Sequence, residues 1–373
     1  MSEWSFNKLE NFFTLKRGYD LPKQNRVLGN IPVISSSGQN DFHIEAKINE
    51  SGVITGRYGT IGSVYFSEIP FWPLNTTLYV NDFKGNDKKF IYYFLQTLDW
   101  EKFSDKSAVP GVNRNDVHQE MVSFPSSQEQ QAIASVLSSL DDKIDLLQRQ
   151  NQTLEQMVAT LFRKWFIEEA KEDWEEKTIG DIFTIKGGGT PSTKEPSYWD
   201  GGIAWTSPRD LSTAKSLYMF STERTITELG LTKVSSGLLP VGTLLMSSRA
   251  PIGYLALTDI EVAVNQGYIA ILKHDLYSNE FMYLWCKANM ELIKNSGNGS
   301  VFQEISKASF RELPFVCPPE PLLKEFNDRC INWFSKIKLN TKQIQTLENL
   351  RDTLLPKLMS GEVRVQYQTE EVA

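Results

Sequence analysis

The sequence has few of the residues from which disulfide scaffolds, zinc sites and membrane helices are built. Its 373 residues include three cysteines, Cys286, Cys317 and Cys330, and no CxxC pair. This argues against a disulfide framework and suits a reducing cytoplasm. The three histidines lie far apart, so a His/Cys zinc cluster is not expected. No run approaches the ~20 apolar residues of a membrane helix, and no signal-peptide core follows Met1.

Positive charge is also scarce. The chain has 39 Lys+Arg against 46 Asp+Glu, for a net charge of -7, and this balance argues at first against a nucleic-acid partner. Taken by segment, the net charge is -1 for residues 1–124, -3 for 125–170, -3 for 171–317 and 0 for 318–373. Since no segment is uniformly acidic, basic surfaces on individual loops remain compatible with the composition.

The strongest positive feature is an internal repeat. Gln-Thr-Leu-Glu occurs at residues 152–155 and again at 345–348, 193 positions later. The same offset pairs Arg114 with Lys307, and both halves begin with a Trp-(x)8-Phe-Thr pattern followed by Lys and Gly. An ordered series of matches of this kind indicates a duplication, in the order globular unit, helix, globular unit, helix.

Each half ends in a segment with coiled-coil spacing. Residues 128–166 contain no Pro or Gly, and their apolar residues recur by alternating threes and fours over more than four heptads. Ser127 and Gln130 predict a capping box at the start of this helix.

The second helix is delimited by proline and glycine. Pro321 is expected at its first position, because proline suits the first turn. Pro356 is expected to end or kink it, and Gly361 to close it.

The two helices, being copies, are predicted to form an antiparallel coiled coil with pseudo-twofold symmetry. Facing a and d positions then place Asn151 and Asn340 in one layer, where paired amides can hydrogen-bond and set the register. The alternative is that each helix packs only on its own globular unit. The residues predicted to pair are Leu140, Ile144, Leu147, Asn151, Leu154, Ile337, Asn340, Ile344 and Leu347.

The predicted fold class is α+β, with two duplicated mixed α/β units joined by the two long helices. Each unit combines short β-rich runs, turns and two short aromatic-rich helices. The predicted boundaries are 1–125 and 171–317 for the globular units, 126–170 and 318–362 for the helices, and 363–373 for a C-terminal tail.

Loops carry the candidate binding residues. Arginine, lysine and tyrosine on loops can reach DNA phosphates and base edges, although ordinary solvated loops have the same composition. The turn at 56–59 is expected to have its counterpart at 247–251, which matches Arg57 with Arg249. The aromatic residues Trp199, Trp205 and Trp285 are expected in the core. The candidates are Arg57, Tyr58 and Arg114 in the first unit and Lys194, Arg209, Arg249 and Lys307 in the second.

Signatures of catalysis are absent or incomplete. The glycines at 187–189 are not part of a GxxxxGK[ST] phosphate loop, and a following proline blocks a helix there. The sequence also lacks GxSxG and the Asn/Asp-Pro-Pro-Tyr/Phe tetrapeptide of amino-methyltransferases. The triplets at 45–47 and 175–177 have the form of nuclease motifs, but metal-dependent cleavage needs a further carboxylate, such as Asp41 or Asp173.

Four further stretches stand out, which are Gly188–Lys194, Tyr198–Ile203, the segment from Asp142 to Phe166 and the tail Leu354–Val365. With these motifs and its duplication, the chain resembles the specificity subunit (HsdS) of type I restriction-modification systems. The resemblance covers essentially the whole chain.

The resemblance implies a non-catalytic, cytoplasmic subunit that recognises double-stranded DNA. Each target recognition domain would read one half of a bipartite, asymmetric target, and the helices would set the spacer and dock two modification subunits. In this family the modification subunits bind S-adenosylmethionine and methylate adenine, and restriction subunits use ATP. These cofactors and Mg²⁺ are expected on the partner subunits, with no cofactor or metal on this chain. The acidic balance then suggests that partners supply much of the phosphate contact.

Two other functions are compatible with the same repeat. One is a stand-alone DNA endonuclease with an internal repeat, which would cleave DNA by itself in the presence of Mg²⁺. The other is a coiled-coil scaffold that does not bind DNA, which a gel shift with and without modification subunits would identify. If the chain recognises a split target, Arg57→Ala is expected to weaken one half-site and Arg249→Ala the other.

Overall fold

Two compact units make up the structure. It is a computed structural model that describes residues 4–104, 110–213, 216–298 and 303–366. One unit consists of residues 1–144 with 346–373, and the other of residues 145–345. Each unit therefore combines a globular part with segments of both long helices. The five segments expected from the sequence follow chain order, whereas this division follows packing.

The described residues of the first unit form three small sheets. Their strand orders are β2-β8-β5-β6, β4-β3-β7 and β1-β9. The strands are β1 Ser5–Lys8, β2 Thr14–Arg17, β3 Ile31–Ser35, β4 Gly38–His43, β5 Gly52–Gly56, β6 Val64–Ser67, β7 Trp72–Pro73, β8 Thr77–Asp82 and β9 Met121–Phe124. The short helices are η1 Leu9–Asn11, η2 Lys23–Asn25, α1 Lys88–Gln96, η3 Trp100–Phe103 and α2 Arg114–His118.

The second unit also contains three sheets. Their strand orders are β11-β18-β15-β16-β13, β14-β12-β17 and β10-β19. The strands are β10 Glu175–Thr178, β11 Ile185–Lys186, β12 Trp199–Thr206, β13 Tyr218–Met219, β14 Arg224–Ile226, β15 Leu244–Ser247, β16 Leu255–Thr258, β17 Ala263–Val264, β18 Tyr268–Ile271 and β19 Pro314–Cys317. The short helices are α4 Ile179–Ile182, η5 Pro196–Tyr198, α5 Pro208–Thr213, α6 Glu228–Leu231, α7 Asn279–Ala288, α8 Met290–Asn295 and α9 Lys307–Arg311.

The sheets of the two units have the same strand order. The run β2-β8-β5-β6 of the first unit corresponds to β11-β18-β15-β16 of the second, and the smaller sheets correspond as well. The second unit adds β13, which pairs in parallel with β16, and the helices α5 and α6. The predicted duplication of an α+β unit is confirmed.

Each core is built from the globular part and from helix segments that are distant in sequence. In the second unit the ring of Phe281 lies 5.1 Å from Phe162 and 5.0 Å from Phe166, measured between centroids. The ring of Phe326 lies 5.0 Å from Phe166. In the first unit Leu358 and Met359 join the aromatic core. No helix in the described ranges is long and apolar enough to cross a membrane.

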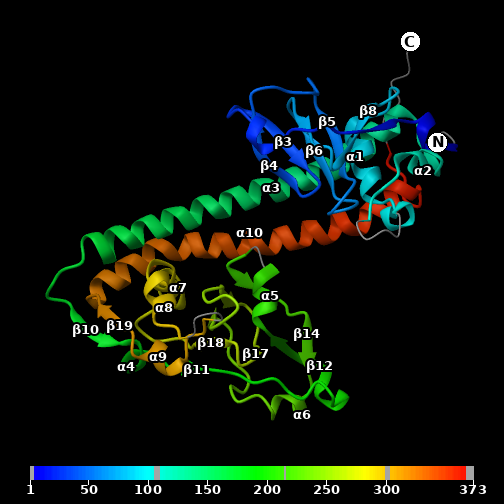
Figure 1. The fold of residues 1–373 in the computed structure, drawn as a ribbon. Helices are drawn as coiled ribbons and strands as arrows, with labels where there is room; N and C mark the ends of the chain where they lie inside the picture. The colour runs from blue at the N-terminus through cyan, green and yellow to red at the C-terminus, as the bar shows by residue number, and fades with distance from the viewer. Residues whose placement is uncertain (1–3, 105–109, 214–215, 299–302, 367–373) are drawn as a thin grey trace. The chain divides into compact units, whose positions relative to one another are not determined.

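The first long helix, α3, runs from Ser127 to Arg163 and continues as a π-helical turn to Glu168 (Figure 1). The predicted capping box is wrong by one residue, since the backbone N–H of Glu129 donates to Ser126 Oγ at 3.4 Å. Gln130 instead receives the backbone N–H of Asp87 at 3.0 Å. The Gln130 amide nitrogen donates to Asn86 Oδ1 at 2.7 Å and to the Pro125 carbonyl at 3.0 Å. The side-chain oxygen of Gln130 therefore holds the residue before α1 and does not cap α3.

The second long helix, α10, runs from Glu320 to Ser360, with Pro321 at its second position. Pro356 lies inside this helix and does not end it. The last turn is held by burial of Leu358 and Met359 in the core of the first unit, which offsets the lost backbone hydrogen bond. Gly361 follows with a φ of 76°, as expected for a glycine that closes a helix.

The asparagine layer lies in the second unit. Asn340 is fully buried, and its amide nitrogen donates to Asn151 Oδ1 at 2.9 Å. Asn151 in turn donates to Thr341 Oγ1 at 3.2 Å. The structure thus brings the two asparagines together as the register predicts. Of the other predicted seam residues, Ile144, Leu147, Ile337 and Ile344 are buried and Leu140, Leu154 and Leu347 are half-buried.

Arg351 occupies a seam position that the heptad pattern leaves polar. In the first unit its guanidinium forms an ion pair with Asp141 at 2.8 Å, and Tyr93 donates to the same carboxylate at 2.6 Å. Nearer the end of the chain, Arg364 forms an ion pair with Glu129, with a second contact of 2.7 Å between Nη2 and Oε2. In the first unit an ion pair between Arg351 and Asp141 therefore joins the two helix segments, and a second pair ties the residues after α10 to α3, whereas the second unit uses paired amides.

Removing one asparagine of the layer should loosen the second unit locally. Asn340→Ala leaves the Asn151 carbonyl without its buried donor, and such a loss costs about 1–3 kcal/mol. We expect faster hydrogen–deuterium exchange in peptides covering residues 335–345. Replacing both asparagines by leucine should recover most of the protection, because no unpaired polar group remains. Unchanged exchange in Asn340→Ala would show that the layer adds no stability.

Candidate nucleic-acid interface

Three arginines of the first unit meet at one cavity. Arg17 ends β2, Arg57 follows β5, and Arg114 begins α2. They line a cavity of about 300 Å³ together with Tyr58 and Asn113. We call Arg17, Arg57 and Arg114, with the cavity that they line, the arginine pocket. The structure thus brings together all three sequence-predicted residues of this unit.

A backbone strap holds the pocket together. The N–H of Val112 donates to the Arg57 carbonyl at 3.0 Å, and Gly111 forms a β-bridge with Tyr58. A Cβ on Gly111 would lie 2.1 Å from the Tyr58 ring, so only glycine allows this approach. The pairing sets the start of α2, and hence Arg114, beside Arg57.

Arg57 is held in place before any ligand arrives. Its guanidinium carbon lies 4.4 Å from the Tyr58 ring centroid, and its Nε donates to the Val112 carbonyl at 3.4 Å. Within the described ranges, Arg17, Arg57 and Arg114 form no ion pair with a carboxylate, and Arg17 and Arg114 are exposed. Their charges are therefore free to attract an anion.

Sequence reasoning did not select Arg17. Arg17 lies in the strand Thr14–Arg17, which belongs to the internal repeat, whereas the candidates are loop residues. The alternation of side chains along a strand could have identified Arg17, since neighbouring side chains of a strand point to opposite faces. Lys16 lies over the Tyr19 ring, with Nζ 5.8 Å from its centroid, and Arg17 faces the pocket.

The second unit places its basic candidates differently. Arg249 forms a 3.8 Å ion pair with Glu304. Lys307 begins α9 and lies against Gly187, where a Cβ would come within 2.3 Å of Nζ. Lys194 and Arg209 are exposed, on a loop and on α5. Within the described part of the chain, no hydrogen bond or ion pair joins these two residues to Arg249 or Lys307.

The sequence pairs Arg57 with Arg249, but the backbone hydrogen bonds of the two units pair Arg249 with the next residue, Tyr58. Ser248 accepts the N–H of Ile305 at 3.0 Å, just as Arg57 accepts that of Val112. Arg249 bridges to Glu304 as Tyr58 bridges to Gly111. Arg249 is therefore the counterpart of Tyr58, and the buried Ser248 is the counterpart of Arg57. Sequence matching aligned the two arginines by type, whereas the hydrogen bonds align backbone positions.

The tryptophans expected in the core are buried. Trp199, Trp205 and Trp285 are between 5% and 7% exposed, which confirms that prediction. The guanidinium of Arg224 stacks on Trp199, 3.4 Å from the ring centroid. Gly188 packs against the Val264 carbonyl, where any Cβ would collide. The glycines at 187–189 therefore include a position where only glycine fits against the neighbouring strand.

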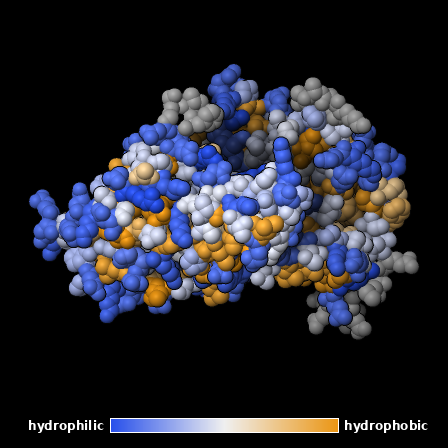
Figure 2. Space-filling view, turned by 90° about the horizontal axis from the view of Figure 1, so that it is seen from below, coloured by the Kyte–Doolittle hydropathy of each residue, from blue (hydrophilic) through white to orange (hydrophobic). Residues whose placement is uncertain are grey.

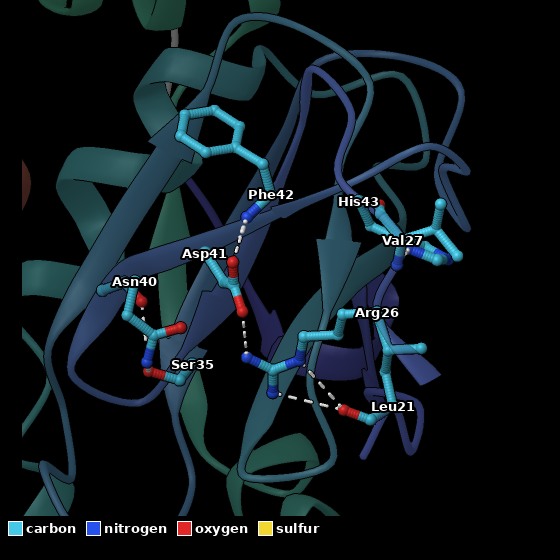
Figure 3. Close-up of polar contacts among 9 residues, drawn as sticks. Leu21, Arg26, Val27, Ser35, Asn40, Asp41, Phe42 and His43 are labelled. Carbon is cyan, nitrogen blue, oxygen red and sulfur yellow. Dashed lines mark hydrogen bonds and ion pairs between the residues drawn. The ribbon is translucent and has the colours of Figure 1, made fainter. Parts of the chain in front are cut away.

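Two of the residues considered for metal-dependent cleavage, Asp41 and Lys47, make contacts of another kind. Asp41 accepts from Arg26 at 2.8 Å and from the Phe42 N–H at 2.9 Å (Figure 3). The hydrogen bond from Arg26, the larger effect, and that from Phe42 lower the Asp41 pKa. Lys47 lies over the Trp72 ring at 4.6 Å. Among the described residues, no group of three His, Cys, Asp or Glu side chains is placed to hold a metal ion.

Comparison with known families decides the relationship. The family model of the type I restriction modification DNA specificity domain matches residues 1–156 and 171–349. The chain belongs to this family. Each half carries one specificity domain. The two matches leave out residues 157–170, which hold the end of α3 and the π-helical turn after it, and the residues after 349.

Several relatives are specificity subunits. The type I restriction enzyme MjaIX specificity subunit of Methanocaldococcus jannaschii is 37% identical over 165 residues, which cover 43% of this chain and 38% of that protein. The HindI specificity subunit of Haemophilus influenzae is 21% identical over 356 residues, covering 74% and 77%. The crystal structure of an S subunit from M. genitalium matches with a TM-score of 0.67 at 20% identity, covering 98% and 97% of the two chains. This structural match supports the fold.

His118 should make the first unit sensitive to acid. Its Nε2 accepts the N–H of Leu15 at 2.9 Å, which docks α2 and its Arg114 on β2. Burial lowers the His118 pKa below its usual value, opposed by Glu10 and aided by Arg114 and Lys84. The ring contributes stability above the unfolded value of about 6.5, and that stability is lost as pH falls through the lowered folded pKa.

Hydrogen exchange at pH 7.5 and 5.5 would measure this effect. We expect peptides covering residues 110–120 to lose protection at the lower pH. The matched region of the second unit is an internal control, since Arg311 stands there in place of a histidine and donates to the Ile185 carbonyl at 2.7 Å. Equal behaviour of the two regions would contradict the role of His118.

Proposed function

We propose that this chain is the DNA-recognition subunit of a type I restriction-modification complex. Each specificity domain binds one half of a bipartite, asymmetric target in double-stranded DNA. The observation that carries the proposal is that the DNA specificity domain occurs twice, once in each structural unit. The arginine pocket supports DNA binding by the first unit, and the exposed basic residues of the second unit support it there.

The complex supplies the chemistry. Two modification subunits bind S-adenosylmethionine and methylate adenine, while restriction subunits use ATP and Mg²⁺ for translocation and cleavage. This chain selects the site and is non-catalytic, and it works in the cytoplasm, where it meets DNA. With a net charge of -7 it depends on its partner subunits for much of the phosphate contact.

The long helices offer a docking surface for the modification subunits. In the second unit Met157 is 44% exposed, Ile331 61% and Leu339 52%. On the face seen in Figure 2, hydrophobic residues form small groups set among hydrophilic ones. Such groups suit the apolar anchors of a protein interface, with a polar rim around them.

Mapping methylated adenines tests the function. Expression of the chain with the modification subunits encoded beside it should produce methylation at a split, asymmetric sequence, and omission of the chain should abolish it. Purified chain incubated with duplex DNA and Mg²⁺ should leave the DNA intact. Cleavage by the chain alone would favour a stand-alone endonuclease. Sequence-independent methylation, or a complex that forms without DNA binding, would favour a scaffold.

Lengthening both helices should change the spacer. The residues near Thr153 are a poor place for an insertion, because Glu155 lies 3.8 Å from Lys287 of the globular part. The junctions 144/145 and 345/346 leave the contacts within each unit intact. One heptad at both junctions adds about 10 Å, or about three base pairs. We expect the same half-sites with a spacer longer by about that amount.

The methylation map measures the spacer between the two half-sites. A heptad inserted in α3 alone serves as the control. That variant shifts the register of the helix pair and should lose methylation. A paired insertion with normal expression and an unchanged spacer would show that the helices do not set the distance.

A further inference from the structure

We propose that the arginine pocket of the first unit binds the phosphodiester backbone of its half-site and that the second unit has no equivalent. The inference rests on the proposed function, and it assigns Arg17 as a DNA-contacting residue. The two half-sites are then held in different ways, one with a strong backbone clamp and the other with few backbone charges.

The pocket suits a phosphate for geometric reasons. Three guanidinium groups reach it from the end of β2, the turn after β5 and the start of α2. A phosphodiester presents only acceptors and carries a full charge, so it can receive donors from several sides. A base edge is read by one bidentate arginine, and each base pair also presents amino donors or a methyl group, which additional guanidinium groups cannot use.

The pocket also limits the entropy lost on binding. Arg57 is already fixed between the Tyr58 ring and the Val112 carbonyl. Among the described residues of the unit, no carboxylate forms an ion pair with any of the three arginines. Ordering the side chains of Arg17 and Arg114 is the remaining entropic cost of binding.

The second unit lacks arginine at each matched position. The strand pairings match Arg17 with Gly187, since Lys16 pairs with Tyr79 as Lys186 pairs with Ala270. Ser248 is the counterpart of Arg57, as the backbone hydrogen bonds of the strap show. Arg114 is matched by Lys307, which has a single ammonium group.

What remains in the second unit is weaker as a phosphate clamp. Arg249, at the place of Tyr58, faces Glu304 at 3.8 Å, so part of its charge is neutralised. Lys307 alone takes up the space over Gly187. Of the backbone contacts that this chain itself makes, and of their salt dependence, the larger part should therefore come from the first unit.

The test measures DNA binding of the complex at several salt concentrations. Full-length chain with its modification subunits is titrated against a duplex carrying the target found by methylation mapping. Each phosphate contact adds about 0.9 to the slope of log K against log salt. Arg17→Ala should reduce the slope by about 1 and weaken binding to all sequences alike. The proposed function is tested separately, by comparing the affinity of the wild-type complex for this duplex with its affinity for a duplex of scrambled sequence.

Lys16→Ala is the matched control, because it removes the same charge from the neighbouring residue, on the other face of β2. A second readout replaces single phosphates by neutral methylphosphonates across both half-sites. At one position, in the half-site of the first unit, the replacement should weaken wild-type binding more than it weakens Arg17→Ala, in which Arg57 and Arg114 remain.

Three results would overturn the proposal while wild-type complex still binds its target. The first is an unchanged slope in Arg17→Ala. The second is a loss of base preference at one position without a change in slope, which would make Arg17 a base-reading residue. The third is an equal reduction of slope by Lys16→Ala, which would show that general charge is responsible.

Discussion

Both units depend on the same constraint, which is that neither globular part completes its core from its own stretch of chain. The second unit needs Phe162 and Phe166 from α3 and Phe326 from α10 around Phe281. The first needs Leu358 and Met359 from the end of α10. Burial of such side chains contributes about 1.5–3 kcal/mol each, so the helix segments are integral to the units. The helices thus both pair with one another and pack on the globular parts.

The segments before α2 and α9, which carry candidate binding residues, are positioned by this packing of the long helices. The strap that positions Arg114 beside Arg57 leads through α2 and β9 directly into α3. The corresponding strap of the second unit leads through α9 and β19 into α10. A loop that is tied at both ends to packed elements presents its side chains in one conformation, which reduces the entropy lost on binding.

Periodicity and repetition were enough to predict the fold. Apolar spacing identified both helices, and the duplicated register placed Asn151 opposite Asn340 because a and d positions must face in an antiparallel pair. Local details were less accessible. The cap of α3 was misplaced by one residue, because Gln130 has tertiary partners that a local motif cannot reveal. Pro356 does not end α10, because burial of Leu358 and Met359 outweighs its cost, whereas Gly361 follows the last residue of the helix as expected.

The candidate site was partly predictable from residue type. Arg57, Tyr58 and Arg114 were chosen as basic or aromatic loop residues, and they share a cavity. Arg17 was missed because only strand pairing shows which face it occupies. Arg249 was matched to the wrong partner, since two arginines at similar distances from Ile-Gly look equivalent until backbone hydrogen bonds are compared.

The division of the chain also bears on how new specificities arise. Residues 145–345 form one uninterrupted stretch of sequence, although they hold a complete unit with its share of both helices. A recombination event that exchanges this stretch between relatives creates only two junctions, and both fall within helices. At such a junction the two helix sequences need mainly to share the same heptad phase. The whole unit of residues 145–345 can then be replaced while the core of the other unit stays unchanged.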